Sequence, residues 1–175
     1  MGFRHALVLG PVSFFIGILF VCLTVDQRIL WGEFTDAVRE DGFQFYATFY
    51  KAPTAIKNML HGFGFIGLVG LISKLHKWDE SAMFFDGSCI GAYVFALAVY
   101  FTVTLPTLRT VVEPLAEDSV WVRGEALRVL SAGNIIIALC LGAILVMQAG
   151  QEYAHRTDLE TVKAVEASEK VKKTE

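Results

Sequence analysis

The segment VLSAGNIIIALCLGAILVMQA, residues Val129–Ala149, contains no charged side chain. A helix of about 20 apolar residues crosses the hydrocarbon core of a bilayer, and this stretch has that length. A helix also satisfies its backbone hydrogen bonds within one segment, as hydrocarbon requires. The stretch therefore predicts a membrane-spanning helix.

Three more apolar segments of spanning length precede it, at Ala6–Val25, Pro53–Ser73 and Ala82–Leu105. The chain is 54% hydrophobic, and its mean hydropathy is +0.51. We therefore predict an all-α, polytopic membrane protein, in which residues 1–149 form a bundle of four transmembrane helices. Residues 150–175 are predicted to form a short charged tail. The first segment exceeds the apolar core of a signal peptide, about 7–15 residues, and is expected to be retained.

Composition argues against several functions. The net charge is −3, and nothing indicates the basic surface that nucleic-acid binding needs. The three cysteines, Cys22, Cys89 and Cys140, lie in different spans without a close partner in sequence. This spacing is not that of a disulfide framework or a redox motif. We expect them to be small apolar core residues.

Four spans place both chain termini on one side of the membrane. Lysine and arginine are divided almost equally between the two sides, so they decide the orientation weakly. Lys74 and Lys77, in the shortest loop, favour cytosolic termini. Lys172 and Lys173, at positions −4 and −3 from the C-terminus, resemble the dilysine signal by which the COPI coat retrieves membrane proteins to the endoplasmic reticulum. The alternative is that both lysines belong to a solvated charge run.

Small residues mark one face in each of two spans: Gly64, Gly67 and Gly70 in the second, and Gly87 and Gly91 in the third. Small side chains let helix backbones approach closely in lipid. We expect these faces to pack the second and third spans together, or to be left open for another protein's helix. The letters of residues 62–67 also match GxGxxG, but a dinucleotide-binding loop follows a strand, and these residues lie in a predicted span.

Polar residues inside the spans are the other candidates. Asp86 is the acidic residue within the predicted spans, and an intramembrane acid is a functional hypothesis by default. The alternative is an interfacial residue that bonds to a neighbouring helix or pairs with Lys74 or Lys77. His61 is expected to bond to another helix, with Asn134 as a candidate partner, and a proton-relay role is its alternative.

The first loop is rich in aromatic residues. Phe45–Phe49 and Tyr46–Tyr50 are i, i+4 pairs, typical of a short helix at the membrane interface. Such a helix is expected to form an aromatic belt or to contact another membrane protein. The histidines and cysteines lack the spacing of a zinc site, and no nucleophile stands beside a base. We therefore expect no metal, no cofactor and no enzymatic activity.

Several stretches resemble a known family, the fungal membrane chaperones that package amino-acid permeases in the endoplasmic reticulum. The most specific is KLHKWDES, which opens Lys74–Gly87; the others are Gly64–Gly70, Leu105–Thr110 and Glu125–Asn134, continuing to Gln148–Tyr153. The resemblance covers roughly residues 5–155.

The resemblance implies a multi-pass protein of the endoplasmic reticulum membrane with both termini cytosolic. Its clients would be newly inserted amino-acid permeases, which it keeps from aggregating and helps to load into COPII vesicles. The glycine faces, with Asp86, Asn134 and His61, would pack the helices or contact clients. The tail is short for this family, which weakens the expectation that it recruits coat proteins. Two alternatives stay open: a small enzyme acting on lipid or sterol through His61, His76, Asp79 or Asp86, and a scaffold subunit of a stable complex.

Overall fold

The computed structural model describes residues 3–75, 80–116 and 118–172, and every regular element in these ranges is a helix. Four helical segments are long and apolar enough to cross a membrane: His5–Trp31, Thr54–Lys74, Phe84–Val112 and Val120–Val162. The predicted all-α fold with four spans is confirmed. The first, third and fourth spans are longer than predicted because polar and proline residues continue the helices instead of ending them.

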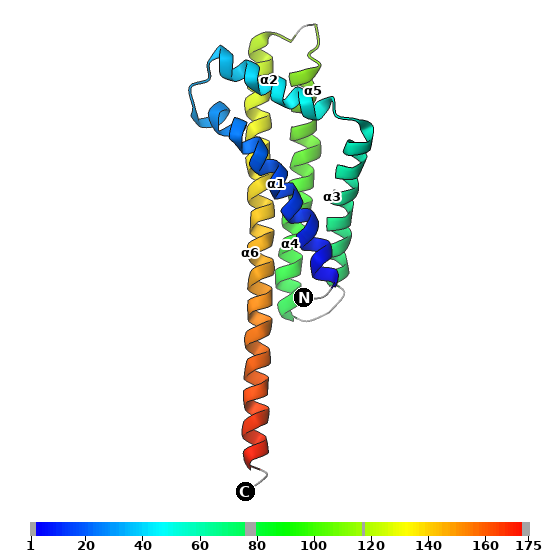
Figure 1. Ribbon diagram of the computed structural model, residues 1–175, viewed down its shortest axis with the longest axis vertical. Coiled ribbons are helices and arrows are strands. Elements are labelled where there is room, and N and C mark those ends of the chain that lie inside the picture. The colour runs from blue at the N-terminus through cyan, green and yellow to red at the C-terminus, as the bar shows by residue number, and fades with distance from the viewer. Residues whose placement is uncertain (1–2, 76–79, 117, 173–175) are drawn as a thin grey trace.

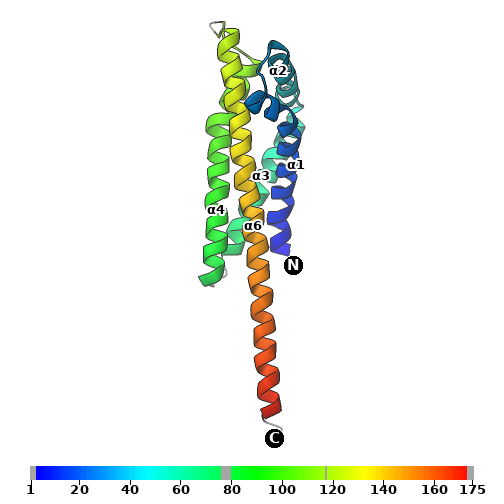
Figure 2. The ribbon, with the colours of Figure 1, turned by 90° about the vertical axis from the view of Figure 1, so that its left-hand side faces the viewer.

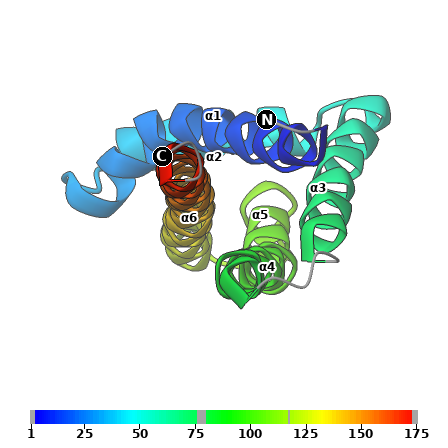
Figure 3. The same ribbon diagram turned by 90° about the horizontal axis from the view of Figure 1, so that it is seen from below.

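The four long helices pack side by side as a bundle (Figures 1 and 2). They are α1 (Phe3–Trp31), α3 (Thr54–Leu75), α4 (Glu80–Val99) and α6 (Val120–Lys172). Viewed from below, α1, α6, α4 and α3 follow one another around the bundle (Figure 3). The start of α1, the end of α3, the start of α4 and the C-terminal part of α6 lie at one end, as four spans require (Figure 1).

The third span is three helical elements in a row. The α4 helix passes into a π-helix, η1 (Tyr100–Thr104), and then into α5 (Leu105–Val112). Pro106 lies in the first turn of α5, where its missing N–H is tolerated. A π turn relieves the clash that a proline ring makes with the preceding turn of an α-helix. The span therefore continues to Val112, beyond its predicted end at Leu105.

The helix predicted in the first loop is α2 (Asp36–Tyr50). Its first turn is capped by Thr35, whose Oγ1 accepts from the Val38 amide at 3.3 Å. The Phe45 and Phe49 rings are in contact, with centroids 5.2 Å apart. In Figure 1, α2 crosses the end of the bundle opposite to the termini.

The α6 helix has 53 residues and is therefore about 80 Å long. It continues through the predicted boundary at residue 149, so the backbone of the tail is helical to Lys172. Its lower part extends beyond the other helices (Figures 1 and 2).

Two buried apolar clusters hold the bundle together. One centres on Leu71, Tyr93 and Ile144, and the other lies under α2 and centres on Phe43 and Leu127. Cys22 and Cys89 are buried and Cys140 is partly buried, all as free thiols. Large apolar side chains on the outer faces of the spans are exposed, which suits contact with lipid tails: Phe20, Phe65, Phe84, Phe95, Leu139 and Val146.

Candidate functional site

Asp86 lies in a buried ion pair at the end of the bundle that carries the termini. Its Oδ1 is 3.1 Å from the Lys74 Nζ atom, and the two side chains are 2% and 6% exposed. This is one of the pairings considered from the sequence. A buried charge is tolerated where a counter-charge and further hydrogen bonds neutralise it.

Two glutamines of α6 supply these hydrogen bonds. Gln148 Nε2 donates to Asp86 Oδ1 at 3.1 Å, and Gln151 Nε2 donates to Oδ2 at 3.1 Å. Lys74 in turn donates to the Oε1 atoms of both glutamines, at 2.7 Å for Gln151. This terminal-end cluster links α3, α4 and α6 through side chains whose charges cancel.

A second polar cluster lies at the opposite end, and the sequence did not predict it. Asp26 is fully buried in α1. Tyr46 of α2 donates its phenol to Asp26 Oδ1, and Asn134 of α6 donates to Asp26 Oδ2 at 3.2 Å. Burial and then the nearby Asp26 carboxyl raise the pKa of the Tyr46 phenol, so the phenol stays protonated and remains a donor. This α2-end cluster links α1, α2 and α6.

Asp26 was missed because the apolar run ends at Val25, one residue before it. The α1 helix continues to Trp31, which carries Asp26 into the bundle. The sequence shows only that Asp26 shares a helix face with Cys22, four residues before it, and Ile29, three residues after it. The burial of that face comes from the structure. The pairing of His61 with Asn134 is wrong, since the Asn134 amide is bonded to Asp26 and Tyr46.

The glycine face of α3 packs mainly on α1. A Cβ atom at Gly70 would lie 2.9 Å from the Leu7 carbonyl oxygen, and one at Gly67 would lie 2.6 Å from the Tyr93 hydroxyl and 3.3 Å from the Pro11 Cβ. On the α4 side, Tyr93 covers Gly67 and donates its phenol to the Gly64 carbonyl at 2.8 Å. Gly70 therefore packs on α1 and not on the third span as predicted, whereas Gly67 lies between α1 and Tyr93 of the third span.

The glycine pair of α4 does not pack against α3. A Cβ atom at Gly87 or Gly91 would meet nothing within 4 Å. The buried face of α4 carries Cys89, Tyr93 and Ala96, and residues two apart lie nearly opposite on a helix. Gly87 and Gly91 therefore face away from the buried side.

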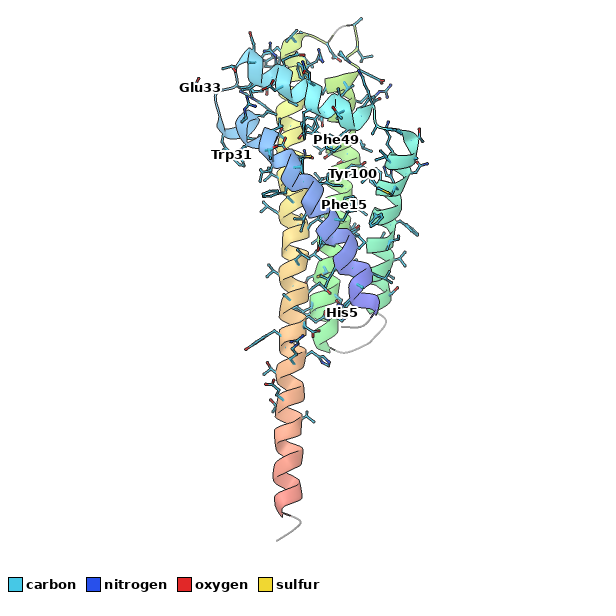
Figure 4. All side chains as sticks on the ribbon, viewed as in Figure 1. His5, Phe15, Trp31, Glu33, Phe49 and Tyr100 are labelled. Carbon is cyan, nitrogen blue, oxygen red and sulfur yellow. The ribbon has the colours of Figure 1, made fainter. Side chains whose placement is uncertain are left out.

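His61 is exposed on α3 and faces the π-helix. Its Nδ1 lies 2.7 Å from the Lys57 carbonyl oxygen, and its Nε2 lies 3.4 Å from the Tyr100 hydroxyl. Tyr100 is labelled in Figure 4, on the side of η1 towards α3. This arrangement links His61 to η1, whereas Asn134 lies in the α2-end cluster.

A half-open cavity of about 320 Å³ lies between α1 and α6, near the start of α1. Its lining is mostly apolar, with His5 (Figure 4), Glu152 and Arg156 among the polar residues. Arg156 Nε is 2.9 Å from Glu152 Oε1, so these charges compensate each other. Across the part of the chain that the structure describes, no three His, Cys, Asp or Glu residues are grouped as metal ligands.

Of the two lysines of the dilysine pattern, Lys172 is the last residue of the α6 backbone and Lys173 lies outside the described residues. His76 and Asp79, named for a possible enzyme site, also lie outside them.

The family model of the SHR3 chaperones, described as ER membrane protein SH3, matches residues 1–175. The chain belongs to this family. No curated protein and no solved structure matches it. As a member of the SHR3 chaperone family, it is a multi-pass chaperone of the endoplasmic reticulum membrane, and the family points to a non-enzymatic role with membrane proteins as clients.

Proposed function

We propose that this protein binds newly inserted amino-acid permeases, prevents their aggregation and promotes their packaging into COPII vesicles. The observation that carries the proposal is the match of the SHR3 chaperone family over the whole chain. Permeases are rich in membrane helices whose polar faces are unsatisfied until they pack together. A chaperone that covers these faces for a time keeps one client from associating with another.

The distribution of charge supports a role in transient contact. Asp86 and Lys74 neutralise each other inside the bundle, and Asp26 is bonded to Tyr46 and Asn134. The outer faces therefore present mostly apolar side chains with few polar groups. Contacts between polar side chains in membranes average about 0.6 kcal/mol, weak enough to reverse. We propose that a client is released when it folds and buries the same faces itself.

The proposal places both termini in the cytosol. In this orientation the tail faces the cytosolic coats, with COPII components as its partners and Lys172 and Lys173 as a retrieval signal for COPI. Replacing both lysines with alanine would then shift the protein from the endoplasmic reticulum to later compartments, as judged by fluorescence microscopy. If the variant stayed in the endoplasmic reticulum like the unchanged protein, the retrieval role would be contradicted.

Permease delivery in fungal cells that lack this protein tests the main proposal. Amino-acid permeases are expected to stay aggregated in the endoplasmic reticulum, and amino-acid uptake should fall. A sugar transporter, as the matched polytopic control, should reach the cell surface. Normal surface delivery of the permeases would contradict the proposal, whereas equal retention of both classes would indicate a general chaperone.

The enzyme alternative has little support from the described residues. Of the groups named for it, Asp86 is occupied by Lys74 and two glutamines. His61 is about 20 Å along α3 from Lys74, and hence far from Asp86. These two groups do not meet at one reaction centre.

A further inference from the structure

We infer that His61, with Tyr100 beside it, forms a docking point for a transmembrane helix of a client that carries a hydrogen-bond donor at this depth. The inference rests on the proposed function and names the surface and the chemistry through which clients are held. It starts from an exposed imidazole in a part of the molecule where lipid surrounds the protein.

The depth of His61 follows from the helix geometry. It lies two turns into α3, about 10 Å beyond the first residue of a span that matches the hydrocarbon thickness. The Lys74–Asp86 pair aligns the antiparallel helices α3 and α4 at the terminal end. From that pair, His61 and Tyr100 each lie about 20 Å further along their helices, and their side chains meet again. Both groups are therefore inside the hydrocarbon layer.

One ring nitrogen of His61 is only weakly hydrogen-bonded. The Lys57 carbonyl can only accept, so Nδ1 at 2.7 Å carries the proton. In the neutral ring, Nε2 is then an acceptor. The Tyr100 hydroxyl, 3.4 Å away, is at the limit of a hydrogen bond and satisfies this acceptor poorly. Nε2 of His61 is therefore an acceptor that a stronger donor from a client can take over from Tyr100.

The surroundings fit a helix and not a lipid headgroup. Phe65, one turn beyond His61 on α3, is 67% exposed, and Phe101 of η1 is 54% exposed. These side chains supply apolar contact beside the acceptor. Headgroups lie about 10 Å away, and lipid tails have no donor. A donor at this depth comes from a protein side chain such as serine, threonine, asparagine or glutamine.

Three variants test the acceptor. His61→Leu removes it and should lower the recovery of pulse-labelled amino-acid permease with the tagged chaperone about three- to thirty-fold. His61→Gln retains an acceptor oxygen at a similar reach and should restore most of the recovery. Thr102→Val is the matched control on η1, because the Thr102 hydroxyl is exposed but already donates to the Ala98 carbonyl at 2.7 Å. Recovery with Thr102→Val should equal that of the unchanged protein.

A second measurement does not depend on the folding of these variants. A photoreactive amino acid at Phe65 should cross-link to the permease, whereas one at Val146, 71% exposed on α6, should not. Undiminished recovery with His61→Leu, or equal cross-linking at both positions, would overturn the docking point. If the unchanged protein recovered no permease at all, the proposed function itself would fail.

Discussion

The Lys74–Asp86 pair shows at the scale of single residues how charge is placed inside a membrane bundle. Each charged atom has its counter-charge at 3.1 Å and amide partners from Gln148 and Gln151. The pair is therefore a structural connection among three helices, even though an intramembrane acid on its own indicates function. Removing one partner should be far more harmful than removing both.

We expect Asp86→Leu to lower the free energy of unfolding by about 3–5 kcal/mol, because Lys74 would remain buried without a counter-charge. The double variant Lys74→Met, Asp86→Leu should recover most of this loss. Thermal unfolding of the purified protein in detergent measures both effects. Equal destabilisation by the single and double variants would show that the pair does not act as a unit.

The glycines of α3 and α4 allow a matched comparison between a helix face packed against a neighbouring helix and a helix face that meets no other residue. Gly70→Ala places a Cβ atom 2.9 Å from the Leu7 backbone oxygen, so α1 must move and the protein should lose about 1–3 kcal/mol. Gly91→Ala meets nothing within 4 Å and should gain up to about 1 kcal/mol from helix propensity. The same unfolding assay separates them, and a shift of equal size and sign would contradict the packing described.

At the scale of elements, α2 is fixed to the bundle by a few directed contacts. Tyr46 reaches Asp26 of α1, and the Arg123 guanidinium of α6 lies 4.2 Å from the centre of the Phe43 ring. The same guanidinium donates to the Val111 carbonyl at 2.8 Å. The α2 helix thus joins α1, the end of α5 and the start of α6 at one end of the bundle.

Tyr46→Phe should loosen α2, because it leaves the buried Asp26 carboxyl without its phenol donor at a cost of about 1–3 kcal/mol. Hydrogen exchange of residues 36–50, followed by mass spectrometry, should become faster. Tyr50→Phe is the control, since the Tyr50 phenol donates to Glu113 at an exposed site, and it should change exchange little. Unchanged exchange in Tyr46→Phe would mean that apolar packing alone holds α2.

At the scale of the whole molecule, α6 is a single rod that joins the bundle to the tail (Figure 1). The cavity beside α1 is lined by α6 side chains as far as Arg156. Ending the chain after Val162 should therefore leave the melting temperature in detergent nearly unchanged. A fall of several degrees would reveal a stabilising contact of the distal tail.

The same truncation separates the two roles proposed for the molecule. It removes Lys172 and Lys173 and should release the protein from the endoplasmic reticulum if they are read as a retrieval signal. Client binding by the bundle should persist. Loss of client recovery at an unchanged melting temperature would assign part of the binding to the tail.

The four spans, the helix in the first loop and the placement of both ends of the chain on one side could be predicted from the amino-acid sequence. These features are local: a helix satisfies its hydrogen bonds within one segment, and solubility in lipid depends on the composition of that segment. The resemblance to the family could also be identified from short runs of sequence such as KLHKWDES.

Which side chains meet between helices follows from the packing of the bundle and could not be predicted from the sequence. Spans that are apolar all round carry no stripe of apolar residues that marks the inner face. Gly70 and Gly91 therefore look alike in sequence, although Gly70 faces the backbone of Leu7 and Gly91 faces open space. The α2-end cluster joins Asp26 to Tyr46 and Asn134, 20 and 108 residues away along the chain. Such contacts depend on the rotation and register of packed helices, which no single segment encodes.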